Sequence, residues 1–226
     1  MTQEEVLKQL QEFGTVQNRK VYRRHGVGED LYGVSYANLG KLKKRIKTDH
    51  ELAIKLWQTG NHDASILATM IADPAKATDE HLESWVQDLS NYVITDAFAS
   101  YAAKTGLAQK KMEQWTRSSD EWVGRAGWLV LAHLAMHSEE LSDRYFEPYL
   151  EIIEKDIHAS RNRVKDAMNS ALAALGIYRE SLSEKALSAA RKIGKVEVDH
   201  GETGCKTPDA ESYIQKALER KSKRAK

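Results

Sequence analysis

Apolar residues recur along most of the chain with the spacing of amphipathic helices. Leu82, Trp85, Val86 and Leu89 occupy positions i, i+3, i+4 and i+7, which places them on one helical face turned toward a core. The same spacing begins again at Ala64 and at Met168. The segment from residue 122 to 135 is apolar nearly all round, which predicts a helix in the middle of a stack.

Helix start and stop signals divide this pattern into short elements. Thr48, Ser118 and Ser181 each precede a Glu by three residues, the spacing of a capping box. Thr207 precedes Pro208, a pair typical of an N-cap followed by the first helical position. Glycines and Asp-Pro mark the breaks, and the alternating residues 196–198 are too few to found a sheet. The pattern therefore predicts helices over residues 3–12, 15–25, 35–47, 49–59, 62–72, 78–89, 91–104, 107–117, 120–137, 142–157, 160–178, 181–193 and 207–220.

Many short helices with brief connectors, paired at spacings near forty residues, are typical of helical-hairpin repeats. We therefore expect an all-α fold, a HEAT-like solenoid (α-α superhelix) forming a single domain over residues 1–226. Within it, residues 196–226 are expected to form a C-terminal loop and a capping helix with a basic tail. A stack of this kind curves, so it has a concave face.

Composition narrows the class of protein. With 41% hydrophobic and 30% charged residues among 226, the chain fits a soluble globular protein. The longest apolar runs are too short to span a bilayer, the acidic N-terminus does not resemble a secretory signal, and a lone Cys205 excludes an internal disulfide. We expect a cytoplasmic protein with no membrane partner. Net charge is only +1, but basic residues gather in clusters that could line one face.

Two charged residues stand among aromatic and apolar neighbours. Asp96 follows Tyr92 by four residues, and Arg125 lies between Trp122 and Trp128. A carboxylate and a guanidinium in such settings indicate a site for a cation and an anion together, and alkylated DNA offers a positively charged base beside a phosphate. The alternative is a buried ion pair between Asp96 and Arg125 that fixes two helices, and the aromatic residues could all be core packing.

Several stretches in order resemble the DNA alkylation repair family, the AlkD-type HEAT-repeat DNA glycosylases. The resemblance covers roughly residues 30 to 195, and no single motif in it is specific. The stretches that carry it are 32–35 (YGVS), 41–44 (KLKK), 49–57 (from Asp49 to Trp57), 64–74 (from Ala64 to Pro74), Trp85-Val86 with Asp96, and Trp115 with 122–126 (WVGRA).

The resemblance implies a function and a site. The family cradles duplex DNA on a basic concave surface and hydrolyses the N-glycosidic bond of cationic alkylpurines such as 7-methylguanine and 3-methyladenine. Its Trp-Asp-x-x-Asp motif falls on residues 92–96, so Asp96 keeps the catalytic carboxylate while Tyr92 and Val93 replace Trp and Asp. Arg125 falls on the Arg that helps hold the DNA backbone, and a family aromatic falls near Ser170.

The chemistry fits those residue types. Breaking the glycosidic bond develops positive charge on the sugar, which an ionised carboxylate such as Asp96 stabilises. Tyr92, one helical turn away, offers an aromatic face, and Arg125 could clamp a phosphate with two hydrogen bonds. For further phosphate contacts, the cations that share helical faces are the best candidates: Lys41, Lys44, Arg45, Arg161 and Lys165.

Two other interpretations remain open for the function. The departures at Tyr92, Val93 and Ser170 fit a paralogue that binds damaged or branched DNA without catalysis. Helical repeats are also general binding surfaces, and the near-neutral charge fits a protein–protein scaffold. No cofactor is expected, and we expect a monomer.

Metal binding is a minor alternative. Asp199, His200 and Cys205 share a glycine-rich loop, and His133 and His137 stand at i and i+4 on a helix, a spacing that can bind zinc. A flexible loop makes a poor metal cage, so the sequence favours a structured turn that seats the last helix. The two histidines are expected to pack or to face solvent, because no Glu follows His133 as a metalloprotease would require.

Overall fold

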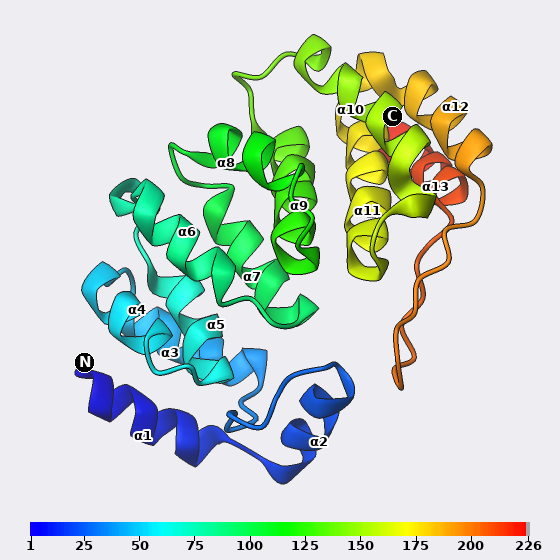
Figure 1. The fold of residues 1–226 in the computed structure, drawn as a ribbon. Coiled ribbons are helices and arrows are strands. Elements are labelled where there is room, and N and C mark those ends of the chain that lie inside the picture. Colours follow the sequence, from blue (N-terminus) through cyan, green and yellow to red (C-terminus); the bar gives the residue numbers. More distant parts are fainter. Residues whose placement is uncertain (225–226) are drawn as a thin grey trace. The chain divides into compact units, whose positions relative to one another are not determined.

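A computed structural model describes residues 1–224 of the chain and shows a succession of helices (Figure 1). Within this range no residue lies in a β-strand, so the predicted all-α class is confirmed. Residues 196–198, the one hint of a strand in the sequence, have no regular secondary structure. No helix in the described part of the chain combines the length and the apolar character needed to cross a bilayer.

The chain divides into two compact units. The N-terminal unit holds residues 1–107 together with 201–203, and the C-terminal unit holds residues 108–200 and the chain from 204 onward. The sequence predicted one domain over residues 1–226. The division into two compact units does not test that prediction, which stays a prediction.

The N-terminal unit is built around α5. Helices α3, α4 and α7 all pack on α5, and α6 packs on α7. Because α5 is surrounded, it is buried at most positions from His62 to Ile71. Trp57 and Trp85 stack in this core with ring centroids 4.1 Å apart. The helices of the unit are α1 (Gln3–Phe13), α2 (Val16–Arg24), α3 (Tyr36–Ile46), α4 (His50–Trp57), α5 (His62–Ile71), α6 (Asp79–Gln87) and α7 (Tyr92–Ala102), with a 3-10 turn at Pro74–Lys76.

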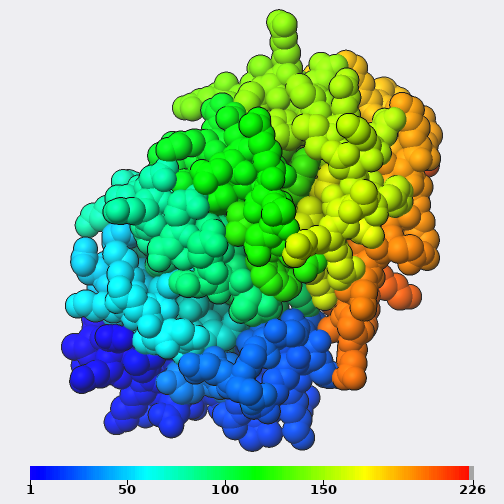
Figure 2. All heavy atoms as spheres, in the orientation of Figure 1, coloured from blue at the N-terminus to red at the C-terminus, as the bar shows by residue number. Residues whose placement is uncertain are grey.

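The C-terminal unit is built around the long pair α9 and α11. Helix α9 also packs on α8, while α12 and α13 pack on α11. The predicted burial of residues 122–135 is confirmed, since most of these side chains are enclosed. The helices of the unit are α8 (Ala108–Trp115), α9 (Glu121–His137), α10 (Asp143–Asp156), α11 (Asn162–Tyr178), α12 (Ser183–Ile193) and α13 (Ala210–Arg224), with 3-10 turns at Ile157–Ala159 and Glu180–Leu182. In the space-filling view, side-chain atoms occupy the spaces that separate the ribbons of neighbouring helices (Figure 2).

Arg179 closes the C-terminal end of α9. Its guanidinium donates to the carbonyls of Ala135, Leu134, Ser138 and Leu141 at 2.6–2.9 Å. The last carbonyls of a helix have no partner within the helix, so one planar cation here satisfies several of them at once.

The predicted capping boxes at Thr48, Ser118 and Ser181 are wrong. Helices α4 and α9 begin instead after Asp49 and Asp120, whose carboxylates accept hydrogen bonds from the free N–H groups of the first turn. An ionised carboxylate at the N-terminus of a helix stabilises the helix in two ways: it accepts a hydrogen bond, and its negative charge interacts favourably with the positive end of the helix dipole. Ser181 lies in a 3-10 turn and bonds Asp143, so α12 starts later.

The last helix also starts later than the sequence predicted. Asp209, rather than Thr207, accepts a hydrogen bond from Ser212 N–H, and α13 begins at Ala210. Helix α13 runs through the basic tail to residue 224, and Lys226 of that tail lies outside the described residues.

Candidate functional site

Helix α7 carries the predicted carboxylate. Asn91 begins the helix, its side chain accepting from the N–H groups of Val93 and Ile94 at 3.1 and 3.2 Å. This start places Tyr92 and Asp96 one turn apart on the same side of α7. Ile94 and Phe98 turn inward to the core, and Asp96 is exposed. The carboxylate is therefore available to solvent on a rigid element.

Tyr92 is tied to another helix of the N-terminal unit. Its hydroxyl makes a hydrogen bond with Nδ1 of His25, the residue that ends α2, and the two ring centroids are 5.7 Å apart. The tyrosine that replaces the family's Trp thus has a polar partner for its hydroxyl. His25 was not found by reading the sequence, because no local pattern relates it to a residue 67 positions later.

Tyr36, also missed by reading the sequence, lies in the electrostatic range of Asp96. Burial raises the pKa of Tyr36 to about 12, and the phenol of Tyr22 and the charges of Asp96 and Asp63 add to the shift. With this raised pKa the phenol stays neutral at neutral pH, and because the residue is 49% exposed it can donate a hydrogen bond to a ligand. Asp96 and Tyr36 together form a polar, solvent-facing part of the N-terminal unit.

Asp63 fixes the loop that leads into Tyr36. Its buried carboxylate accepts the backbone N–H groups of Tyr32, Gly33 and Val34 at 2.6–2.9 Å. Gly33 takes φ +79°, a conformation that favours glycine. These bonds explain why the residues 32–35 are constrained, and they hold the start of α3 in one position.

Arg125 lies in the C-terminal unit and is only 3% exposed. Its Nη1 donates to Oδ2 of Asp166 at 2.9 Å and to the carbonyl of Arg163 at 3.0 Å. The guanidinium predicted to clamp a phosphate is therefore bonded to α11 of its own unit. Ser170, in the position of the missing aromatic, is exposed on α11 and donates to the Asp166 carbonyl at 3.0 Å.

The glycine-rich loop after α12 extends this network. The hydroxyl of Thr207 donates to Asp166 at 3.2 Å and lies 2.9 Å from Nε2 of His200. His200 Nδ1 lies 3.3 Å from the guanidinium of Arg163. His200 thus seats the loop on α11, as the sequence favoured. Among residues 1–224 no group of three or more His, Cys, Asp or Glu side chains is placed to hold a metal ion.

The predicted phosphate contacts divide between the units. Lys41, Lys44 and Arg45 are exposed on α3, where Lys41 bonds Asn38 and Arg45 bonds Gln9. Arg161 is exposed at the start of α11, and Lys165, one turn on, is half-buried.

Known proteins are similar to this chain over most of its length. The model of the family described as DNA alkylation repair enzyme matches residues 6–218. The chain belongs to the DNA alkylation repair family. Two uncharacterized members of similar length are Lin0241 of Listeria innocua, 33% identical, and Lmo0209 of Listeria monocytogenes, 34% identical, each over 89% of this chain and 90% of the relative.

A solved structure supports the HEAT-like fold. It matches with a TM-score of 0.90 and 31% identity, over 98% of this chain and 95% of its own. That protein is described as one of a new family related to the HEAT-like repeat DNA glycosylases, with affinity for branched DNA structures. The predicted HEAT-like architecture is confirmed, and within the DNA alkylation repair family the chain resembles a branch related to the glycosylases.

Proposed function

We propose that this member of the DNA alkylation repair family binds DNA and prefers branched structures. The observation that carries the proposal is the state of Arg125, which is buried against Asp166 and the Arg163 carbonyl. A guanidinium held in this way supports a helix-joining role in place of a phosphate clamp beside a damaged base. The branched-DNA affinity of the similar solved protein supports the same function.

The exposed cations supply the phosphate contacts in this proposal. Lys41, Lys44 and Arg45 of α3 would contact the backbone from the N-terminal unit, with Arg161 and Lys165 from the C-terminal unit. Each phosphate contact releases counterions, so affinity falls steeply as salt rises. We infer that the protein binds as a monomer in the cytoplasm, as expected from the sequence.

A gel-shift measurement tests the proposal with the full chain on a four-way junction and on a linear duplex of the same sequence. The junction should bind at least about tenfold more tightly at physiological salt, a modest ratio for structure-dependent binding. Lys44→Glu should weaken binding, and it should reduce the slope of the logarithm of the binding constant against the logarithm of the salt concentration by about one unit. Lys155→Glu, which changes an exposed lysine of α10, is the control. Equal affinity for junction and duplex would overturn the preference for branches.

The excision of cationic alkylpurines is a second candidate. The exposure of Asp96, one turn from Tyr92 and within electrostatic range of Tyr36, favours it. An ionised carboxylate so placed would stabilise the positive charge that develops on the sugar. The test measures release of 7-methylguanine from methylated duplex DNA by the wild type and by Asp96→Asn. If the wild type releases the base and Asp96→Asn does not, the protein is a glycosylase. If neither protein releases it, DNA binding remains as the proposed function.

A further inference from the structure

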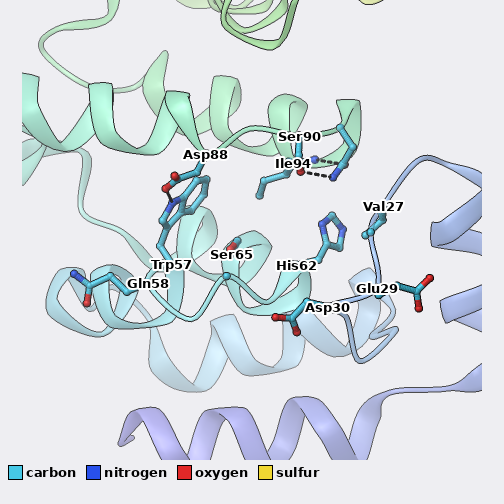
Figure 3. Close-up of a pocket in the computed structure, with 13 residues that line it drawn as sticks. Val27, Glu29, Asp30, Trp57, Gln58, His62, Ser65, Asp88, Ser90 and Ile94 are labelled. Atoms are coloured by element: carbon cyan, nitrogen blue, oxygen red, sulfur yellow. Dashed lines mark hydrogen bonds between the residues drawn. The ribbon is translucent and has the colours of Figure 1, made fainter.

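The N-terminal unit contains a pocket that the proposed DNA binding does not use. It has a volume of about 490 Å³ and lies where the loop before α3, the α4–α5 turn and the start of α7 meet (Figure 3). Pockets for small molecules commonly have about 300–1,000 Å³. The pocket is therefore large enough for a small organic ligand.

The charge that lines this pocket is negative. Glu29, Asp30 and Asp88 are among its lining residues, and the described residues that line it include no Lys or Arg. Glu29 is already paired with Arg23, so the negative charge open to a ligand is that of Asp30 and Asp88. Asp88 accepts Trp57 Nε1–H at 2.8 Å and Asp30 accepts the Asn61 amide at 2.9 Å. Each of these bonds uses one carboxylate oxygen, and the second oxygen has no further partner among residues 1–224. A phosphate or a nucleotide would be repelled here, and a cation would be attracted.

Two largely buried side chains that line the pocket have no hydrogen-bond partner for their polar atoms among the described residues. His62 is 8% exposed and Ser65 is 7% exposed, and both line the pocket. Figure 3 shows the His62 ring extending into the space between Val27 and Ile94. The ring packs edge-on against Tyr22, with centroids 5.7 Å apart, and neither its nitrogens nor the Ser65 hydroxyl bonds to another described group. The polar atoms of these two side chains are not enclosed by protein, so the imidazole and the hydroxyl can bond a ligand or ordered water in the pocket.

The imidazole is suited to accept a hydrogen bond. Burial lowers the pKa of His62 below its ordinary value, although the nearby charge of Asp63 opposes the shift. The neutral ring then has one nitrogen that accepts, and it adds no positive charge to the pocket.

We propose that this pocket binds a small organic cation that carries N–H donors, an ammonium or a guanidinium group. The N–H groups would donate to His62 and Ser65, and the positive charge would face the carboxylates of Asp30 and Asp88. Charge-assisted hydrogen bonds of this kind are the stronger ones, and they select a charged donor over a neutral one. The proposal does not depend on whether the protein prefers branched DNA.

Isothermal titration of the full chain with agmatine, which carries both cationic groups, tests the proposal. Agmatine should bind the wild type, and butylurea, a neutral analogue with similar N–H donors, should not. Asp88→Asn, which keeps an acceptor for Trp57, should weaken agmatine binding by at least about tenfold because it removes a charge that faces the cation. Glu151→Gln, at an exposed carboxylate of α10, is the matched control and should leave binding unchanged.

Two further measurements separate the remaining outcomes. Ser65→Ala, a small change that preserves packing, should also weaken agmatine binding, and unchanged thermal unfolding of each variant excludes misfolding as the cause. A Gly-Arg-Gly peptide that binds as tightly as agmatine would identify the ligand as a side chain of another protein, whereas weaker binding would identify a free small molecule. Absence of agmatine binding, or equal binding by wild type and Asp88→Asn, would overturn the proposal.

Discussion

The guanidinium of Arg125 lies 2.9 Å from the carboxylate of Asp166, and this pair joins α9 to α11. Asp166 in turn accepts the hydroxyl of Thr207, which contacts His200 of the loop that precedes α13. One buried ion pair therefore connects two central helices and the C-terminal loop. Removing Arg125 is costly, because the half-buried Asp166 carboxylate loses its counterion and the Arg163 carbonyl loses a donor.

We predict that Arg125→Met destabilises the fold by about 2–3 kcal/mol, below the range of about 3–5 kcal/mol for a fully buried pair, because the Asp166 side chain is 19% exposed. The free energy of unfolding from urea denaturation measures the effect. Arg144→Met, at an exposed arginine of α10, should stay within about 0.5 kcal/mol of the wild type. If the two variants were equally stable, the structural role of Arg125 would be refuted.

The helices of this fold could be predicted from sequence because their apolar positions repeat locally. The stripe of residues 82–89 and the apolar segment 122–135 became α6 and α9, within one or two residues at most ends. The starts were less certain, since Asp49 and Asp120 compete with nearby Thr and Ser for the same free N–H groups. A carboxylate wins that competition through its charge.

Residues of the candidate site could be predicted from the sequence only where a local pattern or a family motif pointed to them. Asp96 stood out as a charge among aromatic and apolar neighbours, the resemblance gave it a catalytic role, and it is exposed on α7. His25 and Tyr36 could not be found, because their relation to Tyr92 and Asp96 arises when α2, α3 and α7 meet in space. No local pattern relates Arg125 to Asp166, which lies 41 residues later on a different helix.

Two glycines within helices should respond in opposite ways to alanine. A Cβ at Gly127 would lie 2.4 Å from the backbone nitrogen of Thr116, where α9 meets the end of α8. Gly127→Ala must push backbone apart and should cost about 1–3 kcal/mol. A Cβ at Gly40 in α3 would meet no atom within 4 Å. Gly40→Ala should therefore stabilise the protein by about 0.5–1 kcal/mol, since Ala favours the helix.

Thermal and urea unfolding of the two glycine variants measure these effects. Both changes replace a helical glycine with alanine, so a difference in stability between the two variants reports the surroundings of each position and not the type of substitution. A Gly127→Ala variant as stable as the wild type would contradict the close approach of α8 and α9, and a loss of stability in Gly40→Ala would contradict the open space at Gly40.

His81 makes the N-terminal unit sensitive to acid. Its ring packs edge-on against Trp85 and lies near His50, and neither of its nitrogens has a hydrogen-bond partner among residues 1–224. Burial, and to a lesser degree the charge of His50, lower the pKa of His81 from 6.5 to about 4. Between these two values the unfolded chain binds more protons at this residue than the folded chain does. Stability from His81 is therefore fully present above pH 6.5 and is lost as the pH falls toward 4.

We predict that His81→Phe reduces the loss of stability between pH 6.5 and 4, because phenylalanine keeps the packing on Trp85 without a titrating group. The free energy of unfolding at several pH values across this window measures the change. His158→Phe is the comparison, since this half-exposed histidine bonds the carbonyl of Ile193. An unchanged pH slope in His81→Phe would show that the ring is solvated in the folded state.

Tyr92, Val93 and Ser170 depart from the residues that the glycosylase family has at these positions. If Tyr92, Val93 and Ser170 are what separate this chain from an excising enzyme, then restoring the family's residues should raise excision. The triple variant Tyr92→Trp, Val93→Asp and Ser170→Trp should release 7-methylguanine from methylated duplex DNA faster than the wild type. Adding Asp96→Asn to it should lower that release by about 10²-fold, the effect of removing one group that stabilises the charge of the transition state.

Two controls make the result of the restored motif decisive. Asp88→Asn in the same triple variant removes an exposed carboxylate outside the motif and should leave release unchanged. Binding of the four-way junction should survive all of these substitutions, because the phosphate contacts proposed on α3 are untouched. Release that rises in the triple variant but does not depend on Asp96 would place the catalytic group elsewhere. A triple variant that folds and binds DNA yet releases nothing would show that these three departures are not what separates this chain from an excising enzyme.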